Sequence, residues 1–132
     1  MRLGDVEMEK IRSHRDLKVW QKAIDSAMEV FEVTKNFPRE ELYSMVDQIR
    51  RSSRSVAANI AEAWRKRRYS AAWVSKLNDA EAEAAETQTH VEPARRCQYL
   101  SHTHADNLDG QYEEIIAMLA TMSNQPEKWC LG

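Results

Sequence analysis

The chain has 132 residues, of which 30% are charged and only 3 each are glycine and proline, and its formal net charge is −2. This length fits one domain, and so few turn residues argue against a β-sandwich or a β-barrel. The longest apolar run, residues 115–120, is far shorter than the roughly 20 residues of a membrane span. Because the first residues also lack an apolar signal core, a cytoplasmic location without a membrane partner is expected.

Residues 1–15 mix charges with little periodicity and are expected to form a loose arm. Apolar residues then recur every three or four positions over residues 17–34, and a second apolar row over residues 19–37 runs beside the first. This spacing predicts a helix, which Pro38 ends because proline disfavours helical geometry at the residue before it. Two adjacent apolar rows indicate a second contact, either deep burial of the helix or a subunit interface.

The second helix is predicted to open at Pro38, with Glu40 and Glu41 in the first turn where the helix dipole favours acids. Its apolar row starts at Leu42 and continues to Ala63. The middle of this helix is rich in Ser and Ala, which lets a neighbouring backbone approach closely. The run of cations over residues 65–68 closes the helix, because cations suit its carbonyl end.

Ser70 can cap a third helix, and Pro93 lies inside its apolar pattern. Pro93 should kink this helix or split it near His90, because the proline ring displaces the carbonyl four residues back. Ser101 or Thr103 can cap a last helix.

Four helices with short loops predict an all-α fold, an up-down-up-down four-helix bundle over residues 16–124. The C-terminal tail, residues 125–132, shows no pattern that assigns a structure to it. The two cysteines, Cys97 and Cys130, are too few and too far apart for a disulfide framework or a cysteine-based zinc site.

The sequence contains few residue patterns that are typical of a catalytic site. A di-metal carboxylate site in a bundle needs Glu-x-x-His on two helices, and the chain contains no such motif. The candidate ligands would be Glu62, Glu83, Glu86 and His90, and the alternative is that these acids form a solvated face opposite the basic second helix. There is no Gly-rich phosphate loop, and no nucleophile with a base stands out. The sequence therefore predicts no catalytic residue, metal, cofactor or small-molecule substrate, and a protein that is not an enzyme.

The charges are unevenly distributed along the chain. Residues 38–68 contain eight Lys and Arg against four Asp and Glu, whereas residues 69–92 contain one Lys against five acids. Trp64 and Tyr69 stand among the cations, and Arg beside aromatic rings is a common way of holding single-stranded RNA. The alternative is that these cations pair with the acidic third helix. The candidate nucleic-acid contacts are Arg50, Arg51, Arg54, Arg65, Arg67 and Arg68.

Several stretches resemble a known family. Residues 16–23 (DLKVWQKA) and the central stretch 48–63 (QIRRSSRSVAANIAEA), together with residues 86–88 and 97–100, resemble the small bundle proteins encoded within intervening sequences of bacterial 23S rRNA genes. The resemblance covers roughly residues 14–122. It implies a four-helix bundle that assembles into a homopentameric ring. It also implies a relation to the accessory variability determinant proteins of diversity-generating retroelements, which bind a reverse transcriptase and its template RNA through a basic surface.

Three positions depart from the family pattern. Ala63 and Gln98 stand where the family usually has glycine, and Pro93 interrupts a helix that is usually continuous. The net charge of −2 also differs from the strongly basic ring of the retroelement proteins. A structural polar network is expected from four residues of the matched stretches, Gln48, Asn59, Glu62 and Glu86.

These observations together predict a non-catalytic, self-associating helical scaffold. Its candidate partners are further copies of itself, RNA and a reverse transcriptase, so that it would act as an accessory factor of RNA or of a ribonucleoprotein. The alternative is a protein–protein interaction adaptor with no nucleic-acid role, in which the acidic and basic helices recognise partner helices.

Overall fold

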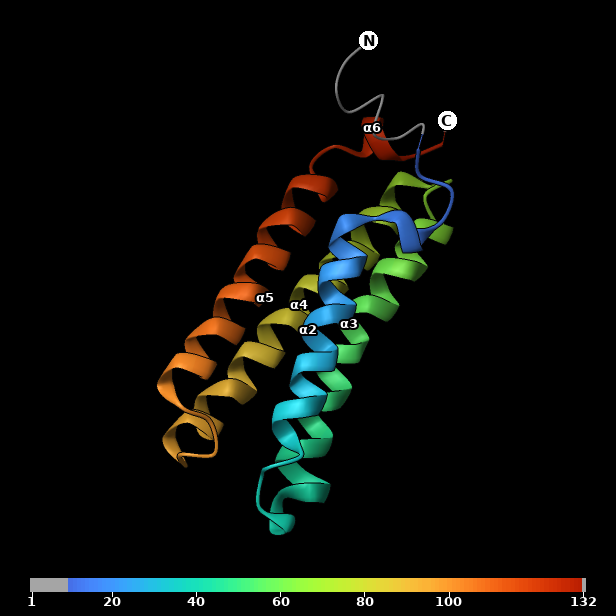
Figure 1. Cartoon of the computed structure of the whole chain (residues 1–132). Helices are drawn as coiled ribbons and strands as arrows, with labels where there is room; N and C mark the ends of the chain where they lie inside the picture. The colour runs from blue at the N-terminus through green and yellow to red at the C-terminus, as the bar shows by residue number, and fades with distance from the viewer. Residues whose placement is uncertain (1–9, 132) are drawn as a thin grey trace.

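The computed structural model describes residues 10–131. Four long helices lie side by side and alternate in direction, joined by short connections (Figure 1). Within residues 10–131 there is no strand, and no helix combines the length and hydrophobicity that crossing a bilayer requires. The predicted all-α class is confirmed. The long helices are α2 (Lys18–Thr34), α3 (Asp47–Arg65), α4 (Ser70–Arg96) and α5 (His102–Ser123).

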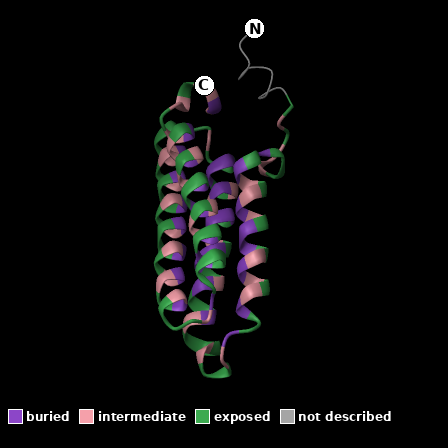
Figure 2. Cartoon of the chain, turned by 60° about the vertical axis from the view of Figure 1, so that its left-hand side comes forward, coloured by how far each residue is buried: buried purple, intermediate pink, exposed green. Residues whose placement is uncertain are grey.

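Short helices occupy the two ends of the bundle. Helix α4 packs between α3 and α5, and α2 packs on both α3 and α5. Buried positions lie on the sides of the long helices that face one another (Figure 2), as the three- and four-residue spacing of apolar residues requires. Most of the arm predicted for residues 1–15 lies outside the described residues. The short helices are η1 (His14–Asp16), η2 (Arg39–Glu41), η3 (Leu42–Val46) and α6 (Pro126–Trp129).

Of the two apolar rows on α2, the one that begins at Val19 faces the core. Ala23 and Val30 of this row are fully buried. In the other row Trp20, Ile24 and Phe31 are only half-buried. Neighbouring Met28 is 54% exposed. Helix α2 therefore keeps a partly exposed apolar strip on its outer side.

The second helix starts later and less regularly than predicted. After Pro38 the chain forms the 3-10 turn η2 and then the π turn η3, and regular α-helix begins only at Asp47. A π turn has i→i+5 hydrogen bonds and so shifts the residues before it out of register with the helix that follows. Val46 is buried, but Leu42, predicted to begin the apolar row, is 41% exposed and Tyr43 is 91% exposed.

Of the kink or split predicted in the third helix, the split does not occur. Helix α4 continues through Pro93 and ends at Arg96, so the split expected near His90 is wrong. The reason is the position of the proline, which is exposed and close to the end of the helix. The carbonyl of Thr89 loses its N–H partner, and because Thr89 is itself exposed, water can satisfy that carbonyl.

Helix α4 ends in a left-handed turn at Gln98. The N–H of Tyr99 donates to the carbonyl of Ala94 at 2.9 Å and the N–H of Gln98 donates to the carbonyl of Arg95 at 3.0 Å. This is the Schellman pattern, which places the residue after the cap in the left-handed region, usually as glycine. Gln98 has a φ of 64°. A residue with a Cβ therefore adopts the left-handed conformation, in which the Cβ comes too close to the following carbonyl oxygen.

Replacing that side chain should stabilise the protein. Gln98→Gly is expected to raise the free energy of unfolding by about 1 kcal/mol, because glycine adopts the left-handed conformation without the Cβ clash. Urea denaturation measures this change. Gln98→Ala is the control, since it removes the side chain but keeps the Cβ, and it should give no such gain. Equal stability of the two variants would show that the backbone at this position is not strained.

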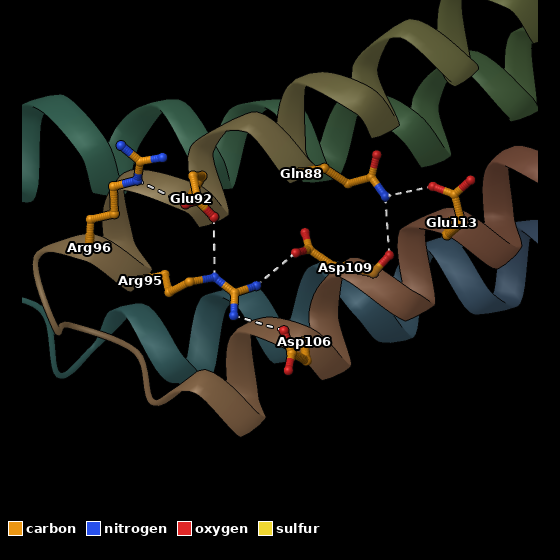
Figure 3. Close-up of polar contacts among 7 residues, drawn as sticks. All are labelled: Gln88, Glu92, Arg95, Arg96, Asp106, Asp109 and Glu113. Carbon is orange, nitrogen blue, oxygen red and sulfur yellow. Dashed lines mark hydrogen bonds and ion pairs between the residues drawn. The ribbon is translucent and has the colours of Figure 1, made fainter.

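Arg95 joins the ends of α4 and α5 (Figure 3). Its guanidinium contacts Asp106 at 2.7 Å, Asp109 at 3.0 Å and, within α4, Glu92 at 3.2 Å. Nearby, the amide of Gln88 donates to the backbone carbonyl of Asp109 at 3.1 Å. Burial raises the pKa of Asp109 in spite of the neighbouring guanidinium. These contacts fix the α4–α5 hairpin at the end of the bundle opposite α6.

The predicted patternless tail closes the other end of the bundle. Trp129 of α6 is 6% exposed and stacks on Trp73 of α4, with ring centroids 6.1 Å apart. The N–H of Leu131 donates to the carbonyl of Arg67 at 3.0 Å. The tail thus reaches across to the α3–α4 turn, at the end of the bundle where α2 begins (Figure 1).

Candidate nucleic-acid interface

The six candidate arginines fall into two groups on α3 and on the turn after it. Arg50, Arg51 and Arg54 lie in the first half of α3, and the other three lie at or just beyond its C-terminus. Arg54 and Arg65 are eleven positions apart, which corresponds to about 16 Å along a helix axis. The six side chains therefore do not form one patch.

In the first group, Arg50 is engaged in holding α2 and α3 together. Its Nε donates to Thr34 Oγ1 at 2.8 Å, and its guanidinium lies 4.6 Å from the centroid of the Phe31 ring. Arg51 is exposed and pairs with Asp47, one helical turn away, at 3.3 Å. Of this group, Arg54 is exposed and forms no ion pair with another described residue.

In the second group, Arg67 also has a structural role. Its guanidinium lies 3.6 Å from the centroid of the Trp64 ring, and its Nη1 donates to the Trp64 carbonyl at 2.9 Å. Burial, together with the charge of Arg65, lowers the pKa of Arg67. Arg65 and Arg68 are exposed, and neither forms an ion pair with another residue of the range 10–131. These two side chains are available to an external anion.

The segment before α2 adds cations to the second group. Ser13 and Asp16 form a capping box around η1, which turns the chain so that Arg15 lies over the Trp20 ring at 5.6 Å. Burial, followed by the charges of Arg15 and Arg65, lowers the pKa of His14, as expected for a segment that lies beside the end of α3. The sequence predicts a loose arm over residues 1–15, whereas residues 13–16 form a capped turn. The spacing of Ser13 and Asp16, a Ser-x-x-acid pattern, is the local signal that indicates the turn.

These cations gather at the end of the bundle that α6 closes. Asp16, the acid of η1, accepts hydrogen bonds from the backbone N–H groups of Arg12 and Ser13, and these bonds lower the pKa of Asp16. Tyr69, in the α3–α4 turn, is 66% exposed. We call this surface the basic end, and its cations are Arg12, Arg15, Lys18, Arg65, Lys66, Arg67, Arg68 and Lys128.

The predicted polar network has the members Gln48, Asn59, Glu62 and Glu86. The amide of Asn59 donates to the carbonyl of Ser55 within α3, at 3.0 Å. Glu62 pairs with Lys76 of α4 at 2.8 Å, and Glu86 lies 3.5 Å from His90 of its own helix. Gln48 and Glu86 both line a hollow between α3 and α4. Among the described residues, however, no hydrogen bond or ion pair joins any two of the four side chains.

A buried hydroxyl pair supplies one polar contact inside the bundle. Ser52 Oγ of α3 lies 2.8 Å from Thr87 Oγ1 of α4, and both residues are buried. The Thr87 hydroxyl also donates to the carbonyl of Glu83 in its own helix. It therefore makes one hydrogen bond to α3 and one within α4. Single Ser and Thr residues on apolar rows are common, and the sequence pattern alone did not distinguish this pair.

Of the candidate metal ligands, Glu83, Glu86 and His90 line one hollow beside α4, and Glu62 lies apart from them. Burial, and then the neighbouring Glu86, raises the pKa of Glu83, while Glu62 is engaged with Lys76. In the part of the chain that the structure describes, no three His, Cys, Asp or Glu side chains are arranged to hold a metal ion.

Comparisons with known proteins agree with the bundle. A family model described as 23S rRNA-intervening sequence protein matches residues 15–121. The chain is similar to a crystal structure from Bacteroides thetaiotaomicron, described as a protein with unknown function from the S23 ribosomal protein family. The two share 29% sequence identity and a TM-score of 0.73, over 80% of this chain and 95% of that chain. No curated protein matches this chain.

Proposed function

We propose that this chain, which belongs to the 23S rRNA-intervening sequence protein family, is a non-catalytic helical scaffold that binds RNA through its basic end. The family resemblance seen in the sequence is confirmed by the match over residues 15–121. The observation on which the proposal depends is the gathering of cations at one end of a protein whose net charge is −2.

The composition of the basic end suits RNA. Phosphates attract clustered Arg and Lys, and their binding releases counterions from the nucleic acid. Aromatic rings beside arginines offer stacking surfaces for unpaired bases, and here exposed Tyr69 stands next to Arg68 in the chain. The exposed cations Arg65 and Arg68 are the proposed phosphate contacts, together with Arg12 and Arg15 from the segment before α2.

We also propose that the scaffold is a homo-oligomer, built through the outer side of α2. The half-buried Trp20, Ile24 and Phe31 and the 54% exposed Met28 form an apolar strip that a second copy would cover. The homopentameric ring and the partnership with a reverse transcriptase stay predictions from the family resemblance. In a ring, several basic ends would act on one RNA, which raises avidity without new contacts.

Titration of a fluorescently labelled single-stranded RNA with the full chain tests the proposed function. Affinity should fall steeply as salt is raised, because log K falls linearly with log salt concentration when phosphates are neutralised. Fluorescence anisotropy at several salt concentrations measures the slope. An affinity that does not change with salt, or no binding at low salt, would contradict the proposal. No binding at low salt, together with a native mass of several chains, would favour the protein-interaction adaptor.

A further inference from the structure

The net negative charge of the chain comes from its first nine residues, which we call the N-terminal segment. Residues 1–9 contain three acids and one arginine, a balance of −2 that equals the formal net charge of the whole chain. Acids and apolar residues alternate over residues 5–9 (DVEME), and such alternation gives an extended segment one acidic and one apolar side. Leu3 adds a further apolar side chain. The N-terminal segment therefore suits an apolar surface that is bordered by cations.

The N-terminal segment joins the described part of the chain at the basic end. Ile11 packs against the core, and η1, which follows it, contacts both α2 and α3. Nine extended residues span up to about 30 Å, whereas the axes of packed helices lie about 8–10 Å apart. The segment is therefore long enough to cross this end of the bundle.

An apolar hollow of about 210 Å³ opens at the same end, between the start of α2, the end of α5 and α6. Leu17, Met118 and Met122 contribute to its mostly apolar lining. Its volume is below the roughly 300–1,000 Å³ that is typical of small-molecule sites. The hollow therefore suits apolar side chains of a docked segment better than a separate small molecule.

Side chains, rather than helix ends, give the surroundings of the hollow their positive charge. The start of α2 and the end of α5 both border the hollow, and the dipoles of these two helix ends have opposite signs. Lys18 and Lys128 line the hollow, whereas no Asp or Glu does. The segments that carry the cations of the basic end, residues 12–18, 65–68 and 126–129, contain two acids, Asp16 and Glu127. The three acids of the N-terminal segment would offset part of this excess of cations.

We propose that the N-terminal segment docks on the basic end and competes there with RNA. Leu3 enters the apolar hollow, and the acids of the segment contact the cations around it. The inference rests on the proposed function and adds its regulation, because carboxylates and phosphates then occupy the same cations in turn. RNA that binds the basic end has to displace the segment, so the apparent affinity for RNA is lower than that of the bare surface.

Removing the charges of the segment should strengthen RNA binding. The test variant of the full chain combines three substitutions: Asp5→Asn, Glu7→Gln and Glu9→Gln. It should bind single-stranded RNA about tenfold more tightly, the factor by which a segment docked for about nine-tenths of the time lowers the apparent affinity. The control neutralises three exposed acids near the α2–α3 turn: Glu32→Gln, Glu40→Gln and Asp47→Asn. In fluorescence anisotropy at about 0.1 M salt the control should stay within about threefold of the wild-type chain, because charges are screened beyond roughly 10 Å.

Disulfide formation tests docking without RNA. In a chain that carries Cys97→Ser and Cys130→Ser, Leu3→Cys is combined with Thr121→Cys, at an exposed position that lines the hollow. The control combines Leu3→Cys with Ala71→Cys, at an exposed position in the first turn of α4 that does not line the hollow. The first pair should oxidise about tenfold faster than the second, because docking raises the effective concentration of its two thiols. Neutralising the three acids of the segment should remove this difference.

The outcomes separate docking of the segment from the proposed function. Equal oxidation of the two cysteine pairs would overturn docking and leave salt-dependent RNA binding in place. The same holds if the segment variant binds RNA no more tightly than the control variant does. If the wild-type chain and both variants bind no RNA, the proposed function fails and competition fails with it, while the oxidation rates still decide whether the segment docks. Circular dichroism of each variant checks that the helices are intact.

Discussion

Reversing the charges of Arg65 and Arg68 together (Arg65→Glu with Arg68→Glu) is expected to weaken RNA binding by about 100-fold. A hydrogen bond to a charged group contributes about 1.5–3 kcal/mol, and two such contacts correspond to two or more powers of ten in affinity. The slope of log K against log salt concentration should also become shallower by about 2, because about two phosphate contacts are lost. Because both side chains are exposed, the fold should be unaffected.

The same change of charge elsewhere on α3 provides the control. Arg51→Glu with Arg54→Glu alters the net charge equally, but both residues lie in the first half of α3, away from the basic end. This variant should bind RNA within about threefold of the wild-type chain, because long-range charge effects are screened by salt beyond roughly 10 Å. Equal losses in the two variants would mean that overall charge, rather than the basic end, determines binding.

Truncating Trp129 to alanine should lower the free energy of unfolding by about 3 kcal/mol. Trp129 is 6% exposed and stacks on Trp73, so its removal leaves a cavity where α6 closes the bundle. Removing a buried aromatic side chain typically costs about 3–5 kcal/mol. Urea denaturation followed by circular dichroism measures the change.

Tyr69→Ala is the control for this prediction. It removes an aromatic side chain of the neighbouring α3–α4 turn that is 66% exposed, so the free energy of unfolding should change by less than about 1 kcal/mol. A loss at Trp129 no greater than that at Tyr69 would show that α6 does not contribute to the stability of the bundle.

The helices were predictable because burial imposes a periodic spacing on apolar residues. Buried residues recur every three or four positions along α3, α4 and α5, and the exception is Leu42, which was predicted to begin the apolar row of the second helix but is exposed. The errors at Leu42 and Pro93 have local causes. A π turn shifts register without a residue signature, and a proline near an exposed helix end costs little because water replaces the lost partner.

The candidate interface was predictable only in part. Arg65 and Arg68 are exposed at and just beyond the end of α3, as a run of terminal cations indicates, but Arg50 and Arg67 are engaged with Phe31 and Trp64. Whether an arginine is engaged in this way depends on which residues of the other helices lie beside it. That is decided by tertiary packing, which the pattern of one helix does not reveal. The cations before α2 were missed for the same reason, because only the capped turn of η1 brings them beside α3.

Ultraviolet crosslinking of bound single-stranded RNA, with the linked peptides identified by mass spectrometry, tests RNA binding at the basic end most directly. Crosslinks are expected in three segments that meet there: residues 12–20, residues 64–69 and residues 118–129. Crosslinks confined to the first half of α3, or to the α4–α5 hairpin around Arg95, would contradict binding at the basic end.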